Sequence, residues 1–474
     1  MRAMKRIGYY KFLIGLQAEW PEDVIREIQR CLVDLNKNRK LVVIDDDPTG
    51  SQLVKDISVL TEWDEDFLAR ELASPLSAFY ITTNSRGKPP EVAEAINTAI
   101  GKNLQSAAEK QNMKITIVSR GDSTLRGHFP GEVDALARGI GIDFDGMFLI
   151  PALLEDGRFT IDDVHYIVRN GWLVPVGNTD YARDATFGYS SSNLKEWVEE
   201  KSGGAVKKED VFSISLDELR RQGPDAVYRR MVSLPKGFIC VVNAVSRKDI
   251  EVFTLAMLRA ELKGKNYMTR SGPSFVPVRM GLDEYPLMTK EQMPDMRKDA
   301  GGLTIVGSYV ANSTRQIEEV LRRNLVKSIV VELEKVLDDR KRAKAVGAYA
   351  EQINQCVQQG QDVMLYTSRK LLLGADAQSS LMVGQKVSTS LIEILRSISV
   401  RPRYILAKGG ITSSDMATQG LGVRRAMILG QIEKGISVWK LGPETKFDGL
   451  YYLVFPGNVG NADTLARVIT ELKI

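Results

Sequence analysis

Three consecutive aspartates follow a short apolar run near the start of the sequence. Leu41 to Ile44 predicts a buried strand, and Asp45, Asp46 and Asp47 come directly after it. In open α/β sheets, ligands bind beyond the carboxyl ends of the strands, so these carboxylates are well placed for a site. One could act as a general base, and another could orient substrate hydroxyls or hold a magnesium-bound phosphate. A solvated acidic turn is the alternative, although three adjacent like charges repel one another.

Two further polar clusters follow the next expected strands. Thr83 to Gly87 comes after Ala78 to Thr82, and its Arg86 has the planar fork that pairs with a carboxylate. The third cluster, after Ile115 to Val118, combines guanidiniums, a carboxylate and hydroxyls: Ser119, Arg120, Gly121, Asp122, Ser123, Thr124, Leu125, Arg126, Gly127 and His128. A buried polyhydroxy acid needs donors and acceptors of these kinds. A capped loop is the alternative for either cluster alone.

Glycine-containing turns recur in the C-terminal half. Gly307-Ser308, Lys408 to Thr412 and Phe455 to Asn458 each follow an expected strand. Glycine lets the backbone approach a phosphate, and amides at a helix N-terminus attract anions, so these turns predict a nucleotide site. Steric demands of strand-to-helix turns are the alternative reason for glycine. Neither GxxxxGK[ST] nor GxGxxG occurs, which excludes a P-loop kinase.

The elements that must position these turns alternate between strand and helix patterns, which is typical of parallel α/β construction. We expect strands that include Met147 to Ile150, Phe238 to Val242 and Leu303 to Val306, and a helix over Pro21 to Leu35. The stretch around 263–297 has several prolines and no clear period, and it predicts a passage between domains. We therefore expect a helical extension at 1–39, a domain at 40–272, a passage at 273–300 and a domain at 301–474. Each domain should be a mainly parallel sheet flanked by helices, with the active site in the cleft between them.

The bulk composition excludes several classes of protein. With 64 basic and 60 acidic residues, the formal charge of +4 is too small for a nucleic-acid-binding field. Cys31, Cys240 and Cys356 lie far apart and form no CxxC pair, which argues for a reducing compartment and against a thiolate metal site. The 2 histidines exclude a histidine-rich metal centre. No apolar stretch approaches the roughly 20 residues that cross a bilayer, so we expect a cytoplasmic protein without a membrane or nucleic-acid partner.

Taken together, these segments resemble the four-carbon acid sugar kinase family, the bacterial threonate and 3-oxo-tetronate kinases formerly known only as a domain of unknown function. The resemblance covers nearly the whole chain. The residues that carry it are Asp46 to Gly50, Ser85 to Gly87, Arg120 to Gly127, Asp180 to Asp184, Gly307-Ser308, Lys408 to Thr412 and Gly457-Asn458. This chain departs from the family pattern at Arg120, where many members have Lys, and at Asn243, where Asp is usual.

The resemblance implies an ATP-dependent kinase that phosphorylates the terminal hydroxyl of a four-carbon acid sugar, with ATP and Mg²⁺ as cofactors. The implied substrate-binding residues are Asp46, Asp47, Arg86, Arg120, Gly121, Asp122, Ser123 and Thr124. The implied ATP-binding residues are Ser308, Gly409, Gly410, Ile411, Thr412, Gly457 and Asn458. Asp46 or Asp122 would accept the hydroxyl proton, Arg126 would stabilise the transferred charge, and Arg86 would hold the substrate carboxylate. We expect no metal site built from protein ligands, and a homodimer is compatible with this class.

Two other functions fit parts of the sequence. Asp45 to Thr49 also reads as DxDxT after an apolar strand, the nucleophile motif of haloacid-dehalogenase-like phosphatases. In that hypothesis Asp45 would form an aspartyl phosphate and Asp47 would protonate the leaving group. The second alternative is a non-catalytic protein that binds a sugar acid or a nucleotide without turnover.

Overall fold

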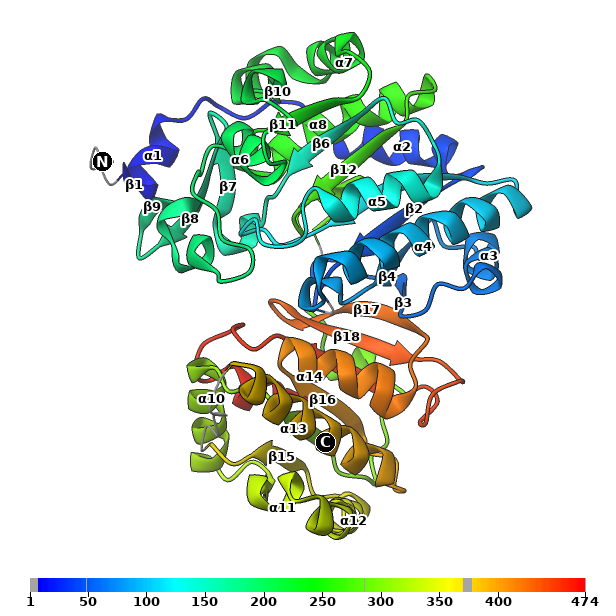
Figure 1. Ribbon diagram of the computed structural model, residues 1–474, viewed down its shortest axis with the longest axis vertical. Coiled ribbons are helices and arrows are strands. Elements are labelled where there is room, and N and C mark those ends of the chain that lie inside the picture. The colour runs from blue at the N-terminus through cyan, green and yellow to red at the C-terminus, as the bar shows by residue number, and fades with distance from the viewer. Residues whose placement is uncertain (1–6, 48, 285, 370–376, 474) are drawn as a thin grey trace. The chain divides into compact units, whose positions relative to one another are not determined.

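The computed structural model describes residues 7–47, 49–284, 286–369 and 377–473, with the side chains of 7 and 377–382 left out of the description. The chain forms two compact units (Figure 1). Unit 1 comprises residues 1–50 and 62–284, and unit 2 comprises residues 51–61 and 285–474. Strands and helices alternate along the chain in both units, so the chain is a two-domain α/β protein, as the alternating pattern predicted.

The sheet of unit 1 is parallel throughout its main strands. Its spatial order is β10 (Val211–Ile214), β11 (Phe238–Val242), β6 (Gly146–Ile150), β12 (Tyr267–Ser271), β5 (Lys114–Arg120), β2 (Arg39–Asp45) and β4 (Ala78–Thr82). Most residues of these strands are buried on both faces, which is why the strands are continuous apolar runs. Strands β10 and β12 were not predicted; β12 lies within the stretch that was read as the start of the passage.

Helices cover both faces of this sheet (Figure 1). The helices α3 (Glu65–Ala73), α4 (Pro90–Lys110) and α5 (Gly131–Ile140) pack on one another. A second group contains α2 (Ile25–Leu35), α7 (Gly223–Ser233), α8 (Arg247–Leu262) and α9 (Phe275–Arg279). The helix expected from Pro21 begins at Ile25, and it packs against α8, so this part of residues 1–39 belongs to unit 1.

A small antiparallel sheet adds to unit 1. Its order is β1 (Ile7–Gly8), β9 (Trp172–Pro175), β8 (Val164–Arg169) and β7 (Arg158–Ile161). Phe159, Ile161 and Leu173 form its core, against which Tyr9 and Phe12 of α1 (Tyr9–Gly15) pack. The helix α6 (Leu194–Lys201) follows, capped by the Asn193 side chain.

The sheet of unit 2 is parallel in one part and antiparallel in the other. Its order is β3 (Ile57–Leu60), β17 (Arg425–Glu433), β18 (Ile436–Leu441), β19 (Tyr451–Phe455), β16 (Tyr404–Lys408), β13 (Leu303–Val306), β15 (Val363–Thr367) and β14 (Lys327–Val331). Strands from β19 to β14 run parallel, whereas β3, β17, β18 and β19 pair antiparallel. The expected division of the chain differs here: residues 51–61 belong to unit 2, because β3 pairs with β17.

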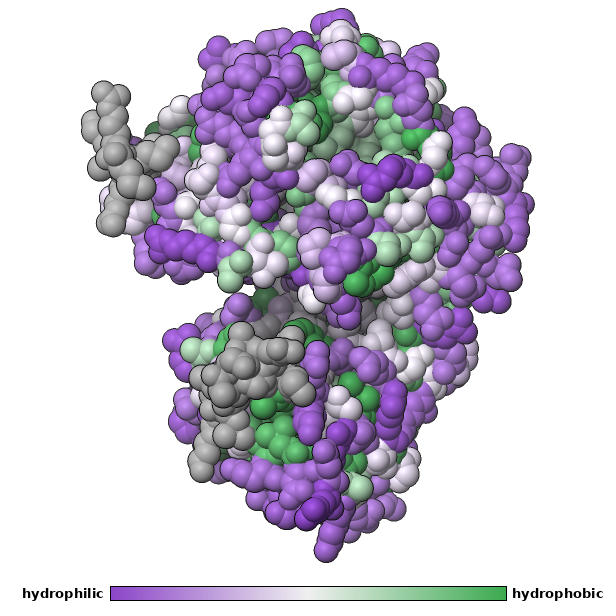
Figure 2. All heavy atoms as spheres, viewed as in Figure 1, coloured by the Kyte–Doolittle hydropathy of each residue, from purple (hydrophilic) through white to green (hydrophobic). Residues whose placement is uncertain are grey.

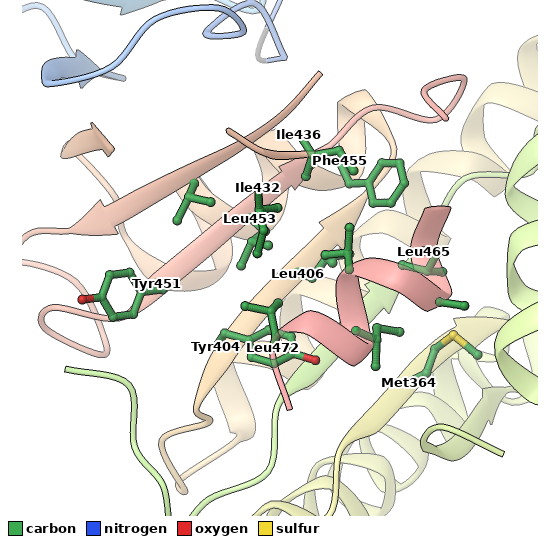
Figure 3. Close-up of a cluster of buried hydrophobic side chains, with 14 of the residues drawn as sticks. Met364, Tyr404, Leu406, Ile432, Ile436, Tyr451, Leu453, Phe455, Leu465 and Leu472 are labelled. Carbon is green, nitrogen blue, oxygen red and sulfur yellow. The ribbon is translucent and has the colours of Figure 1, made fainter. Parts of the chain in front are cut away.

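The core of unit 2 lies between its sheet and helices (Figure 3). Leu406 and Leu453 from the sheet meet Leu465 of α15 (Thr464–Glu471). The other helices are α10 (Ala311–Arg322), α11 (Leu333–Leu337), α12 (Asp339–Gln358), α13 (Ala377–Ser397) and α14 (Gly410–Asp415). Hydrophilic residues predominate on the face of the molecule drawn in Figure 2. In the part of the chain that is described, no helix is long and apolar enough to cross a membrane.

Candidate functional site

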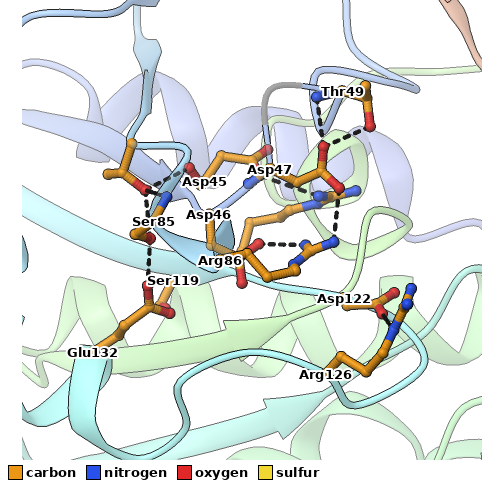
Figure 4. Close-up of polar contacts among 12 residues, drawn as sticks. Asp45, Asp46, Asp47, Thr49, Ser85, Arg86, Ser119, Asp122, Arg126 and Glu132 are labelled. Carbon is orange, nitrogen blue, oxygen red and sulfur yellow. Dashed lines mark hydrogen bonds and ion pairs between the residues drawn. The ribbon is translucent and has the colours of Figure 1, made fainter. Parts of the chain in front are cut away.

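The three polar clusters of unit 1 meet at one edge of its sheet (Figure 4). Strand β2 lies between β4 and β5, and Asp45 pairs in register with Thr82 on one side and Arg120 on the other. Because all three strands run parallel, the turns that follow them share the carboxyl edge. The expectation that these clusters come together is therefore correct.

Arg86 holds two of the aspartates at once. One of its terminal nitrogens donates to Asp46 Oδ1 at 2.5 Å, and the other donates to Asp47 Oδ2 at 2.7 Å. The Asp46 side chain is only 3% exposed, against 24% for Asp47. Burial acts to raise the pKa of Asp47, but Arg86 and Arg120 outweigh it and the pKa is lowered. The fork of Arg86, which was expected to hold a substrate carboxylate, thus faces carboxylates of the protein itself.

Arg270 holds Asp46 from the other side. Its guanidinium lies 3.4 Å from Asp46 Oδ2 and donates to Ser119 Oγ at 2.8 Å. The close packing requires glycine at two loop positions: a Cβ on Gly121 would lie 2.3 Å from an Arg270 nitrogen, and a Cβ on Gly127 would lie 2.9 Å from Asp46 Oδ2. Sequence reasoning missed Arg270. The only local signal was that the polar residues Thr269 to Ser271 follow the apolar pair Tyr267-Met268, as they would at the end of a short strand.

Glu132 of α5 is a second acidic group that sequence reasoning missed. The Ser85 hydroxyl donates to its carboxylate, and Arg270 lies 3.8 Å from its Oε2. Burial and the nearby Asp46 raise the pKa of Glu132, and Arg270 offsets part of that shift. Glu132 therefore ties α5 to the turn after β4 (Figure 4).

Asp45 lies beneath this arrangement and is fully buried. Its Oδ1 accepts from Arg120 at 3.1 Å and from the Asp47 amide at 3.0 Å, whereas its Oδ2 has no hydrogen-bond partner among the described residues. Burial raises the pKa of Asp45 to about 7; Arg120 opposes the shift, and Asp46 and Asp47 add to it. A buried carboxyl of this kind is poorly placed to attack a phosphate, so the geometry does not favour the phosphatase hypothesis.

The loop after β5 is organised around Asp122. Its carboxylate accepts from the Thr124 amide at 3.1 Å, from Thr124 Oγ1 at 2.5 Å and from Arg126 Nε at 2.6 Å. Burial alone would raise the pKa of Asp122, but Arg86 and Arg126 hold it well below its usual range. Leu125 has a φ of 68°, in the left-handed region that side chains other than glycine seldom adopt. Asp122 is therefore an acceptor that shapes the loop, and a weak base.

A buried histidine supports the same loop. His165 Nε2 lies 2.8 Å from the Ser123 carbonyl, which can only accept, so Nε2 carries the proton and Nδ1 accepts from Thr160 Oγ1 at 3.0 Å. Burial lowers the pKa of His165 to about 4, which keeps the ring neutral near pH 7. Ser123 Oγ accepts from Arg158 at 2.7 Å. His165 thus has a structural place beneath the loop.

Three guanidiniums surround the ring of Tyr181. Arg126, Arg169 and Arg158 lie 5.0, 5.3 and 5.8 Å from its centroid. Arg126 is the more accessible of the two that also reach the Asp122 loop, with 30% of its side chain exposed against 16% for Arg158. Its NH1 lies 3.7 Å from Asp184, and its NH2 has no hydrogen bond to any residue that the structure describes. Arg126 therefore has donors available for an anionic ligand.

The glycine turns of unit 2 also meet at the carboxyl ends of parallel strands. Val306 pairs with Lys408, and Lys408 pairs with Phe455, so the turns after β13, β16 and β19 are neighbours. Gly409 has a φ of 118°, which L residues with side chains rarely adopt, and its amide donates to the Phe455 carbonyl at 2.8 Å.

Side-chain contacts join these turns. A Cβ on Gly457 would lie 3.0 Å from Ser308 Oγ, and a Cβ on Gly307 would lie 2.4 Å from Thr412 Oγ1. Ile411 is 69% exposed, whereas Thr412 is buried. Gly410 begins α14, and Asn458 is exposed beside Gly457. The structure thus brings Ser308, Gly409, Thr412 and Gly457 into one glycine-lined bed. Glycine allows a backbone to approach a phosphate closely.

Arg369 is a residue of this region that sequence reasoning missed. It follows β15, donates from NH1 to the Ser308 carbonyl at 2.9 Å, and donates from NH2 to Thr314 Oγ1 at 2.7 Å. Its guanidinium also lies 5.0 Å from the Tyr309 ring. Arg369 therefore brings a positive charge to the turn after β13. Residues 307–310, which form that turn, contain no charged residue, so the local sequence offered no signal of this charge.

Comparison with known domains fits this division of the chain. Residues 41–279 match the model of a sugar-binding N-terminal domain, and residues 303–465 match the model of a nucleotide-binding C-terminal domain. The chain belongs to the family built from these two domains. The match supports the resemblance to four-carbon acid sugar kinases. No functionally curated protein matches the chain.

Solved structures show the same fold. A Salmonella typhimurium LT2 protein, named as a candidate tRNA synthase, is 16% identical over 92% of this chain and 100% of its own, with a TM-score of 0.66. A Haemophilus influenzae protein assigned to a domain of unknown function is 16% identical over 91% of this chain and 100% of its own, with a TM-score of 0.63. At such identities the likeness establishes the fold alone.

Proposed function

We propose that this protein is an ATP-dependent kinase that phosphorylates the terminal hydroxyl of a four-carbon acid sugar. The observation that carries the proposal is the cluster of Asp46, Arg86, Asp122 and Arg126 at the carboxyl edge of a sugar-binding domain, in a chain that also has a nucleotide-binding domain. Such a site offers acceptors for hydroxyl groups and guanidinium donors for a carboxylate. A sugar acid, which has hydroxyl groups and a carboxylate, can bind to both kinds of side chain.

Asp46 is the better of the two candidate bases. Asp122 accepts three hydrogen bonds within its own loop and has a lowered pKa, so it holds the loop in place. Arg86 and Arg270 each bind one carboxylate oxygen of Asp46, so its side chain is held in a single orientation. In the reaction the substrate hydroxyl oxygen forms a bond to the γ-phosphorus, the bond from that phosphorus to the β-γ bridging oxygen breaks, and Asp46 accepts the hydroxyl proton.

The substrate carboxylate is assigned to Arg126 in this proposal. Both terminal nitrogens of Arg86 donate to aspartates, whereas Arg126 is partly exposed and keeps donors for a ligand. A guanidinium paired with the acid fixes which end of the substrate is held and which hydroxyl reacts. Ser123 and Thr124 are then candidates for the hydroxyls between the two ends.

The nucleotide is assigned to the turns of unit 2. Ser308, Gly409, Gly410, Ile411, Thr412, Gly457 and Asn458 would hold ATP, and the glycine bed of these turns fits a phosphate chain. For Mg²⁺, the described residues contain no group of three or more His, Cys, Asp or Glu side chains that is arranged to hold a metal ion. Any Mg²⁺ would therefore be held mainly by the nucleotide phosphates and water.

An ADP-release screen tests the proposal. Purified protein, ATP and Mg²⁺ are mixed with stereoisomers of threonate, erythronate and 3-oxo-tetronate, and ADP is measured with a coupled assay. The proposal expects ADP only when one of these acids is present. ADP formation that is independent of the acid would contradict it. Release of inorganic phosphate from a phosphorylated acid would indicate a phosphatase instead, and ligand binding without ADP would indicate a binding protein.

A further inference from the structure

Lys408 is a buried amine with no ionised partner among the residues that the structure describes. The side chain is fully buried at the end of β16, and Nζ lies 3.6 Å from the centroid of the Phe455 ring. Its hydrogen bonds are long: Nζ donates to the Pro456 carbonyl at 3.3 Å and to the Gly457 carbonyl at 3.4 Å. Within the described part of the chain, no carboxylate forms an ion pair with it. A lysine so placed is costly to keep charged in the free protein.

The position of Lys408 is central to the proposed nucleotide bed. Its backbone pairs with Val306 on one side and Phe455 on the other, so it lies between the turns that hold Ser308 and Gly457. Gly409 follows it directly in the chain. Any charge on Nζ is therefore close to whatever anion lies against these turns.

The elements around Lys408 supply little charge of their own. Strand β13 has no titratable side chain in Leu303–Val306. The titratable or charged groups on the elements around it include Tyr404 of β16, Tyr451 and Tyr452 of β19, Asp415 of α14, Arg369 after β15, and Arg315, Glu318, Glu319 and Arg322 of α10. The Tyr452 hydroxyl donates to the Ser413 carbonyl, and Asp415 accepts from Ser388. On α10, Arg315 and Glu318 are exposed, and Glu319 pairs with Arg322. Burial alone lowers the pKa of Lys408, to about 7.

We propose that Lys408 takes up a proton when the phosphates of a nucleotide occupy these turns, so that nucleotide binding is linked to proton uptake. The inference rests on the proposed nucleotide site and assigns it a positioning residue that acts through the Pro456-Gly457 turn. An anion in a site of low dielectric favours the charged amine. The proton comes from solvent and binds the lone pair of Nζ, and no bond between heavy atoms forms or breaks.

The direction of the pH dependence follows from the pKa of about 7. Below pH 7 the amine is already charged in the free protein, so Lys408 adds no pH dependence to nucleotide binding. Above pH 7 the free amine is mostly neutral, and binding must then bring in a proton. Affinity for the nucleotide therefore falls as pH rises above 7, by up to about tenfold per unit, until the pKa of the bound state is reached.

Calorimetric titration of the full chain with ADP tests this inference. Titrations at pH 8 in buffers of different ionisation enthalpy give the number of protons taken up. That pH is about two units above the second phosphate pKa of roughly 6, so the nucleotide itself contributes little. The wild type should take up about 0.5–1 proton per ADP. Lys408→Met should take up none and should bind ADP with an affinity that changes little between pH 7 and 8.

Lys446→Met is the matched control, because burial also lowers the pKa of Lys446, which lies in another part of unit 2 and donates to the Arg396 carbonyl. It should behave as the wild type. Equal proton uptake by Lys408→Met and wild type would overturn the inference. Should Lys408→Met not fold, the wild-type titrations decide alone: ADP binding without proton uptake at pH 8 overturns this inference and leaves the nucleotide site intact. No ADP binding at all would overturn both.

Discussion

Arg270 and Asp46 face each other across the carboxyl edge of the unit 1 sheet, with 3.4 Å between the guanidinium and Asp46 Oδ2. Arg86 occupies the other carboxylate oxygen at 2.5 Å. One arginine comes from the end of β12 and the other from the turn after β4. The two clamps fix the orientation of the Asp46 side chain, which is what a base or a hydroxyl acceptor needs if it is to act on a single atom of its substrate.

Asp46→Asn should lower kcat of the proposed kinase by about 100-fold or more, because the amide cannot accept the hydroxyl proton. The nearly identical shape should keep the clamp of Arg86 and Arg270 partly in place, so the protein should still fold and still bind the sugar acid. The measurement is steady-state ADP release with the best acid, together with a thermal unfolding curve. Asp66→Asn, at a side chain that is 86% exposed, is the control and should match the wild type. A rate for Asp46→Asn within a few-fold of the wild type would remove Asp46 as the base.

Arg126→Gln should raise KM for the sugar acid with a smaller change in kcat. A hydrogen bond to a charged group contributes about 1.5–3 kcal/mol, which corresponds to roughly 10-fold to 150-fold in KM. Arg126→Lys should recover part of the affinity, because an ammonium keeps the charge but loses the planar fork. The KM for ATP should stay unchanged in both variants. An unchanged KM for the acid in Arg126→Gln would show that the carboxylate binds elsewhere.

Local motifs explain why some of this site was predictable. Asp46, Arg86 and Asp122 each lie within four residues of the end of an expected strand, and the rule that parallel strands end at one edge was enough to bring them together. Arg270 was missed because its partner Asp46 lies far away in sequence, and because the prolines that follow made the whole stretch resemble a passage. Only the pairing of β12 with β5 and β6 reveals its place.

The sequence also did not reveal that residues 51–61 belong to unit 2, for a related reason. Strand β3 has only 4 residues and is buried throughout, so it carries no alternation that would reveal its partner. It pairs with β17, from which it is separated by most of the chain. The hairpin of β17 and β18 was also missed, because register shifts interrupt its pairing and blur the two-residue period. Pairings of this kind are set by tertiary packing, which a short sequence window does not contain.

Asp45→Asn should change how stability depends on pH. The folded pKa of Asp45 is raised to about 7 from 3.8, so the folded state binds more protons than the unfolded state between those values. The associated stability is fully present below pH 4 and is lost as pH rises to about 7, at up to about 1.4 kcal/mol per unit. Asparagine does not titrate, so the stability of Asp45→Asn relative to wild type should rise between pH 5 and pH 8. Urea unfolding at both pH values measures this, and parallel pH dependences of the two proteins would contradict the raised pKa.

Gly409→Ala should weaken nucleotide binding while leaving the binding of the sugar acid intact. At a φ of 118° any side chain strains the backbone, and the added Cβ would lie 3.0 Å from the Ser308 Cβ and 3.1 Å from Thr412 Oγ1. The turn must therefore shift, which moves the amides that would face the phosphates, and we expect the Kd for ADP to rise by about tenfold or more, corresponding to a strain of about 1–3 kcal/mol. Gly347→Ala is the matched control: it lies in α12 with no atom within 4 Å of its Cβ position, so the same change there should leave ADP binding as it is and stabilise the helix slightly. Calorimetric titration of both variants with ADP, and separately with the sugar acid, measures the effect. Equal ADP affinities in the two variants would show that the turn after β16 does not contact the nucleotide.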